Sequence, residues 1–198
     1  MNEIREHRWK SVLFIGAPGT GKGTQSQAID RLPGYYSFNS GAALRAVEAD
    51  SELGQKVQGY LRSGDLVPNN LMLDVWRSRM RRAIDQGDFS PAFDLLLLDA
   101  FPRDADQVEL LSDYVDFQLV IHLQADDEIL KTRLQQRDAR PDDRDVEVID
   151  HRLKIYHQRT KPLLEKFPAD LVATVDAAQP PILVLREVVE RFSAMLRD

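Results

Sequence analysis

The stretch Gly16-Ala-Pro-Gly-Thr-Gly-Lys-Gly-Thr-Gln25 directly follows the apolar run Val12-Leu13-Phe14-Ile15. A β-branched and aromatic run of this length is typical of a buried strand, and we predict a helix over residues 24–32 after it. The glycines allow a tight turn that exposes backbone N–H groups to an anion, and the positive end of the helix faces the same place. Lys22 adds a full charge that can reach the outer phosphates of a nucleoside triphosphate. The stretch therefore predicts a phosphate-binding loop.

The match to the strict pattern G-x-x-x-x-G-K-[ST] is incomplete. Gly23 occupies the position of the hydroxyl residue, and Thr24 comes one place later. An ordinary glycine-rich turn between a strand and a helix is the alternative interpretation. A dinucleotide-binding fingerprint is disfavoured, because a lysine in the turn would crowd a pyrophosphate held by glycine backbone alone. The preceding strand and the following helix favour phosphate binding.

Composition excludes several classes of protein. At 198 residues the chain is expected to form one domain over residues 1–198. The net charge of −6 gives no basic groove for nucleic acid, and no segment approaches the ~20 apolar residues of a membrane helix. The chain has no cysteine, so we expect neither disulfides nor a thiolate zinc site. These features favour a cytoplasmic protein without nucleic-acid or membrane partners.

Apolar runs alternate with helical patterns along the chain. The predicted strands are Val12–Ile15, Tyr35–Phe38, Leu95–Leu98, Leu119–Leu123 and Leu171–Val175. The predicted helices cover residues 24–32, 41–49, 52–63, 69–86, 105–114, 126–136, 145–167 and 181–197. Such alternation predicts an α/β fold with a five-stranded parallel sheet and helices on both faces. Residues 40–86 contain no strand and predict a helical insertion that caps one side of the sheet.

Three polar side chains follow the third predicted strand. Asp99 ends the run Leu95–Leu98, where an acid in a phosphate-loop protein orders a magnesium ion directly or through water. A strand-end aspartate that caps the next turn is the alternative. The pattern Phe101-Pro102-Arg103-x-x-x-Gln107 then places a guanidinium beyond the strand end and an amide one helical turn later. An amide offers a donor and an acceptor together, which suits an adenine edge.

These motifs, taken in order, resemble those of the adenylate kinase family. Besides residues 16–25, the series comprises Ser40-Gly41-x-x-Leu44-Arg45, Gly64-x-Leu66-Val67-Pro68, Asp99-x-Phe101-Pro102-Arg103-x-x-x-Gln107, Arg133-x-x-x-Arg137, Arg140-x-Asp142-Asp143 and Arg152-Leu153-x-x-Tyr156. The resemblance implies the P-loop kinase fold of nucleoside monophosphate kinases. It also implies a helical monophosphate-binding insertion over residues 38–72 and a very short lid over residues 137–143. The implied reaction is reversible phosphoryl transfer from MgATP to AMP, giving two ADP.

The resemblance also implies site residues. For ATP these are Gly19, Thr20, Gly21, Lys22, Gly23, Thr24, Arg133, Arg137 and Ala177. For AMP they are Ser40, Arg45, Val67, Ala100, Arg103, Gln107, Arg140 and Arg152. The implied catalytic residues are Lys22, Arg103, Arg137, Arg140 and Arg152. Thr24 and Asp99 would hold Mg²⁺ through water; zinc is not expected, because the long zinc-binding lid is absent. We expect ATP and AMP as partners and a monomer.

The chain departs from the family pattern at several positions. Ala42 stands where the family has an acid, and Ala100 stands where it has a glycine. The Cβ of Ala100 is harmless only if the backbone there needs no positive φ. The interval from Asp143 to Arg152 is one residue longer than usual, and this residue would turn Arg152 away by about 100° if it lay within the helix.

Three functions remain open at this point. The first is an AMP kinase, and the second is a kinase for another nucleoside monophosphate; Gln107 favours adenine over a pyrimidine. The third is a catalytically weak, nucleotide-sensing relative, which the departures at Ala42, Ala100 and the lid would suit. The retained cationic residues favour an enzyme, because clustered cations are costly unless an anion binds between them. The histidines have no triad or metal spacing, and we assign them no role.

Overall fold

The computed structural model describes residues 8–48, 50–136 and 145–197. Within these residues the strands are β1 (Trp9–Gly16), β2 (Tyr35–Asn39), β3 (Leu95–Asp99), β4 (Val115–Gln124) and β5 (Val172–Asp176). They form one sheet of order β2-β3-β1-β4-β5, in which every pairing is parallel. The predicted α/β class and the five-stranded parallel sheet are therefore confirmed.

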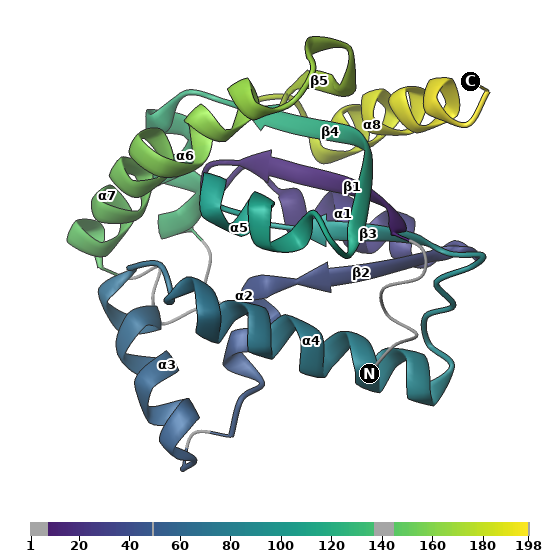
Figure 1. The fold of residues 1–198 in the computed structure, drawn as a ribbon. Coiled ribbons are helices and arrows are strands. Elements are labelled where there is room, and N and C mark those ends of the chain that lie inside the picture. Colours follow the sequence, from purple (N-terminus) through teal and green to yellow (C-terminus); the bar gives the residue numbers. More distant parts are fainter. Residues whose placement is uncertain (1–7, 49, 137–144, 198) are drawn as a thin grey trace.

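Helices connect the strands and cover the sheet (Figure 1). The α-helices are α1 (Lys22–Asp30), α2 (Ser40–Arg45), α3 (Glu52–Ser63), α4 (Asn69–Gln86), α5 (Ala105–Leu111), α6 (Asp127–Gln135), α7 (Val146–Ile155) and α8 (Pro181–Met195). After α7 come a π-helical turn, η3 (Tyr156–Thr160), and two 3₁₀ segments, η4 (Lys161–Lys166) and η5 (Ala169–Leu171). In the part of the chain that is described, no helix combines the length and apolar composition needed to cross a bilayer.

Side-chain alternation along β1 assigns the helices to the two faces of the sheet. Val12 and Phe14 pack in a cluster with residues of α1 and α8. Leu13 and Ile15 point the other way, into a larger cluster with residues of α4, α5, α6 and α7. This period of two is the geometry of an extended strand buried on both faces. In Figure 1, α5 lies in front of the sheet and α1 behind it, as the two clusters require.

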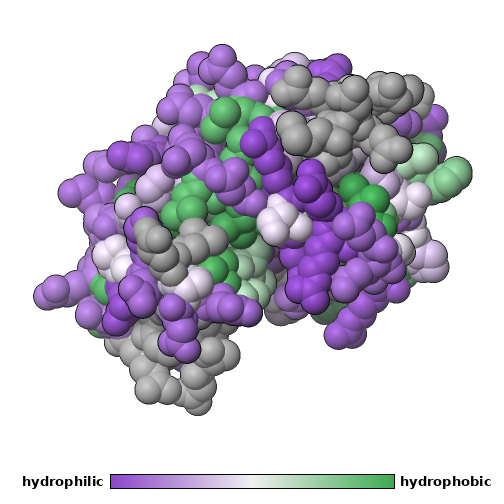
Figure 2. Space-filling model, turned by 60° about the horizontal axis from the view of Figure 1, so that its bottom comes forward, coloured by the Kyte–Doolittle hydropathy of each residue, from purple (hydrophilic) through white to green (hydrophobic). Residues whose placement is uncertain are grey.

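The outer surface of the molecule differs from this interior. Figure 2 shows a mostly hydrophilic face on which apolar residues gather in limited patches between charged ones. Figure 1 shows α2, α3 and the start of α4 beyond one end of the sheet, where the predicted insertion lies. The bounds of that insertion, residues 38–72, stay a prediction.

Several elements differ from the predicted bounds, among them β4, which begins at Val115 rather than Leu119, and two of them differ for identifiable reasons. The first strand begins at Trp9 rather than Val12, because the Trp9 ring packs against Trp76 at 5.6 Å and Phe89 at 5.3 Å between centroids. The helix predicted over residues 145–167 leaves the α-helical path at Tyr156. Pro162 has no N–H and its ring would clash with the carbonyl four residues earlier, so the chain widens into a π-turn before it.

The turn after β3 contains a strained residue. Ala100 has φ +59°, in the left-handed region that favours glycine. The Cβ of Ala100 would be harmless only without a positive φ, and the structure shows that the backbone does have one. The next peptide bond but one, Phe101-Pro102, is cis, and α5 then begins with Asp104 as its N-cap.

We expect Ala100→Gly to raise the free energy of unfolding by about 1 kcal/mol, since glycine adopts the left-handed region without a Cβ penalty. Urea denaturation measures this change. Ala28→Gly, inside α1, is the control and should lower stability by about 1 kcal/mol, because its backbone is already helical. Equal destabilisation by both substitutions would contradict the expected strain at Ala100.

Candidate active site

The loop between β1 and α1 has the backbone of an anion cradle. Gly19 and Gly21 have φ values of +90° and +87°, which turn successive peptide groups toward one side. Lys22 is the first residue of α1, and its Nζ donates to the carbonyls of Gly16 at 2.7 Å and Ala17 at 2.9 Å. The ammonium therefore lies across the loop, at the positive end of the helix.

The position of Gly23 explains the incomplete loop motif. A Cβ built on Gly23 would lie 3.2 Å from Asp99 Oδ2 and 3.4 Å from Asn39 Nδ2. The first distance is tighter than ordinary van der Waals contact, so a hydroxyl residue there would crowd the buried carboxylate. Thr24, the next residue, is exposed and lines the same cavity as Asp99.

Asp99 ends β3 with 2% of its surface exposed, and it accepts a hydrogen bond from Asn39 Nδ2. The other end of the Asn39 amide caps α2, because Oδ1 accepts from the N–H of Ala42 at 2.7 Å. Asn39 thus joins the carboxylate to the first turn of the insertion. Sequence analysis missed this residue, although an asparagine directly before a helical pattern is a recognised N-cap signal.

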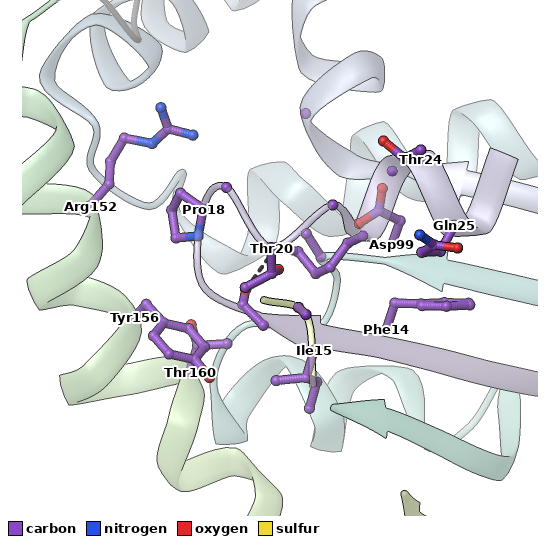
Figure 3. Close-up of a pocket in the computed structure, with 18 of the residues that line it drawn as sticks. Phe14, Ile15, Pro18, Thr20, Thr24, Gln25, Asp99, Arg152, Tyr156 and Thr160 are labelled. Atoms are coloured by element: carbon purple, nitrogen blue, oxygen red, sulfur yellow. Dashed lines mark hydrogen bonds between the residues drawn. The ribbon is translucent and has the colours of Figure 1, made fainter. Parts of the chain in front are cut away.

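Two adjoining cavities meet at the carboxyl ends of the strands. The first has a volume of about 330 Å³, and Figure 3 shows its wall. The predicted residues that line it are Gly19, Thr20, Gly21, Lys22, Gly23, Thr24, Asp99, Ala100, Arg103, Arg133, Arg152 and Ala177. The second, of about 80 Å³, is lined by Ser40, Arg45, Val67, Ala100, Arg103, Gln107 and Arg152. The guanidinium-bearing residues Arg103 and Arg152 line both cavities, so the structure brings the predicted cations to the boundary between them.

The carbonyl of Ala100 organises residues that line the second cavity. Ser40 Oγ and Arg103 Nε both donate to this oxygen at 2.8 Å. Arg103 Nη2 also donates to Ser40 Oγ at 3.4 Å. The residue with positive φ therefore positions the guanidinium and the hydroxyl that face the second cavity.

Arg152 reaches the cavities from α7. A Cβ built on Gly64, the C-cap of α3, would lie 2.8 Å from Arg152 Cγ and 3.2 Å from Val148 Cγ1. Glycine at this position is what allows α7 to approach the end of the insertion so closely. Figure 3 shows Arg152 above the loop, on the same helical run as Tyr156 and Thr160. The longer interval before Arg152 therefore does not turn it away from the site.

Arg133 closes the far wall of the first cavity. Its guanidinium donates to the carbonyls of Ala177 at 2.6 Å and Ala178 at 3.0 Å, in the turn that follows β5. Ala177 is buried, and its N–H donates to Gln124 O at 2.7 Å. Arg133 and Ala177 thus form one packed wall, whereas their contact with a base stays a prediction. Arg137 and Arg140 lie outside the described residues, as does the predicted lid over residues 137–143.

A histidine without an assigned role lies behind the loop. His122 is buried in β4, with Nε2 3.0 Å from Tyr156 Oη and Nδ1 3.4 Å from Thr174 Oγ1. Burial, with smaller effects of Lys161 and Lys22, lowers the pKa of His122 from 6.5 to about 4. Burial, with a smaller effect of Asp127, raises the pKa of Tyr156 to about 12. Both groups are therefore neutral at pH 7, and they join β4 to the helical run that carries Arg152.

The side chains at this site offer few ligands for a metal ion. Among the described residues no group of three or more His, Cys, Asp or Glu side chains could hold a metal by itself. The Asp99 carboxylate lines the first cavity together with Lys22 and Thr24. One carboxylate, water and phosphate oxygens are the ligands that Mg²⁺ prefers in such sites.

We expect the buried histidine to make stability depend on acid pH. In the unfolded chain His122 binds a proton below pH 6.5, whereas in the folded state it does so only near pH 4. The free energy of unfolding should therefore fall by about 3 kcal/mol more in the parent protein than in His122→Gln between pH 7 and pH 4. Urea denaturation across this range measures the difference. Parallel pH profiles for the two proteins would contradict it.

Comparison with known proteins gives a consistent result. The family model described as adenylate kinase matches residues 14–171. A protein of Synechococcus sp. (strain WH7803) named adenylate kinase is 38% identical over 173 residues, which cover 84% of this chain and 89% of that protein. A protein of Thermobifida fusca (strain YX) with the same name is 34% identical over 197 residues, covering 94% and 98% of the two chains.

Proposed function

The chain belongs to the adenylate kinase family, and from that premise we propose that it transfers a phosphoryl group reversibly from MgATP to AMP, giving two ADP. ATP would occupy the first cavity, beside the glycine-rich loop. AMP would occupy the second, beside Gln107. A phosphotransferase must hold a donor and an acceptor end to end, and two adjoining cavities supply that arrangement.

One observation carries the proposal: Arg103 and Arg152 line both cavities, with Lys22 on the ATP side of the boundary. The transferring phosphoryl group passes through this boundary with its charge spread over three oxygens. Planar guanidinium groups bind such oxygens in pairs, and a site that excludes water strengthens the attraction. Cations fixed in place before the reaction stabilise the transition state without further reorganisation.

The chemistry needs no general base from the protein. The attacking atom is a phosphate oxygen of AMP, which is already ionised near neutral pH. The neutral His122 is buried behind the loop rather than among the lining residues, in keeping with this. The chain's contribution is therefore to orient the two phosphates in line and to exclude water.

Asp99 and Thr24 would hold Mg²⁺, through water, on the phosphates of ATP. When bound, the ion neutralises charge that develops on the phosphate oxygens. The contact from Asn39 keeps Asp99 directed at the loop. Arg137 and Arg140 are proposed to reach the same phosphates from the lid.

The test is diphosphate formation by purified protein with ATP, Mg²⁺ and each of AMP, dAMP, GMP, CMP and UMP. We expect AMP to be the best acceptor. Lys22→Met and Arg103→Ala should each lower kcat by about 10²–10³-fold, because each removes a charge that contacts the transferring group. Circular dichroism should show both variants folded.

Arg81→Ala is the matched control, since Arg81 is exposed on α4 away from both cavities, and we expect it to keep full activity. If transfer to another monophosphate is faster than to AMP, that monophosphate is the acceptor and the proposal of AMP is wrong. Binding of ATP with no transfer to any monophosphate would overturn the proposal in favour of a nucleotide-sensing role.

A further inference from the structure

We propose that Asn69 is a positioning residue that fixes the orientation of the Gln107 amide and thereby selects a 6-aminopurine monophosphate over a 6-oxopurine one. Asn69 is the first residue of α4, and Gln107 lies in the first turn of α5. Their side chains meet at 2.8 Å, Gln107 Nε2 donating to Asn69 Oδ1. The inference rests on the proposed function, because it concerns how the base of AMP is chosen.

The first fixed point is a backbone donor. The N–H of Arg103 donates to Gln107 Oε1 at 2.8 Å. A backbone N–H has no acceptor capacity, so the atom that faces it must be the amide oxygen of Gln107. The amide nitrogen of Gln107 is then left to face Asn69, which must present its own oxygen.

The second fixed point is a carboxylate. Asn69 Nδ2 donates to Asp104 Oδ1 at 3.4 Å, and the same oxygen accepts from the N–H of Gln107 at 2.9 Å as the N-cap of α5. An ionised carboxylate can only accept. The chain of contacts from Arg103 through Gln107 and Asn69 to Asp104 therefore has a defined polarity at both ends, and only one arrangement of the two amides satisfies it.

Reversal of the Gln107 amide is costly in this setting. Gln107 is 2% exposed, so little water reaches the side of the amide that faces Arg103 and Asn69. A flipped amide would direct its N–H groups at the Arg103 N–H and its oxygen at Asn69 Oδ1. A buried donor that faces a donor, or an acceptor that faces an acceptor, makes no hydrogen bond but still carries the free-energy cost of desolvation.

The fixed orientation leaves a defined pattern for the base. Gln107 lines the second cavity with one N–H and one lone pair beyond those already used. Adenine complements this pattern, because its 6-amino group donates and its N1 accepts. Hypoxanthine and guanine present the reverse, an accepting O6 and a donating N1–H. Binding of a 6-oxopurine in the same position would require the amide to flip.

The experiment compares equilibrium binding and kcat/KM of AMP with those of inosine 5′-monophosphate. In Asn69→Ala the acceptor for Gln107 Nε2 is lost, and the AMP preference should fall by about tenfold in both measurements. Asn70→Ala is the matched control, because Asn70 is exposed at the next position of α4, and we expect no change.

An exchanged variant, Asn69→Asp with Asp104→Asn, tests the polarity directly. The new carboxylate can accept from Gln107, and the new amide can cap α5 and donate to the carboxylate, at the same net charge. We expect this protein to keep the AMP preference. A preference unchanged in Asn69→Ala, or lost in the exchanged variant, would overturn the inference.

The two proposals fail in distinguishable ways. If the parent protein binds AMP but does not phosphorylate it, the proposed function is overturned, and the ratio of the two dissociation constants still decides the role of Asn69. If neither monophosphate binds, both proposals are overturned. A loss of folding in Asn69→Ala would lower binding of AMP and inosine 5′-monophosphate together, whereas the ratio responds only to the amide orientation.

Discussion

Parallel pairing of β2, β3 and β1 is the constraint on which the rest of the site depends. Asn39 pairs with Asp99 in register, and Phe14 pairs with Asp99 on the other side, two residues before the loop begins at Gly16. Parallel strands end at the same edge of a sheet. The glycine-rich loop, the Asp99 carboxylate and the start of the insertion therefore lie next to one another at that edge. The observed register holds Phe14 and Asn39 opposite Asp99, and helices cover β1 on both faces.

Much of this arrangement could be predicted from the sequence, because its signals are local. The apolar run Val12–Ile15, the glycine-rich turn and Lys22 are adjacent in the chain, and each has a direct physical interpretation. The strand number and the sheet class followed from alternation, since strands and helices have different periods. The ordered motifs then indicated which polar residues converge, and Arg103 and Arg152 do line a shared boundary.

What sequence patterns could not provide were contacts set by tertiary packing. The hydrogen bond between Asn39 and Asp99 joins residues that are far apart in the chain, and the one between His122 and Tyr156 likewise joins β4 to the π-turn. The sequence around either residue of such a pair does not indicate which residue it contacts. The π-turn over Tyr156–Thr160 has a visible cause in Pro162, which indicates a break in the predicted helix but not the form that the break takes. The positive φ of Ala100 is set by the geometry of the turn, and an alanine in a sequence gives no indication of it.

The packing of Arg152 on Gly64 joins the two halves of the site mechanically. The aliphatic stem of Arg152 rests in the space where any other residue at the end of α3 would place a side chain. The end of α3 is therefore part of the surface that supports this stem. Because Arg152 lines both cavities, the end of the insertion and the wall shared by the two cavities belong to one packed contact.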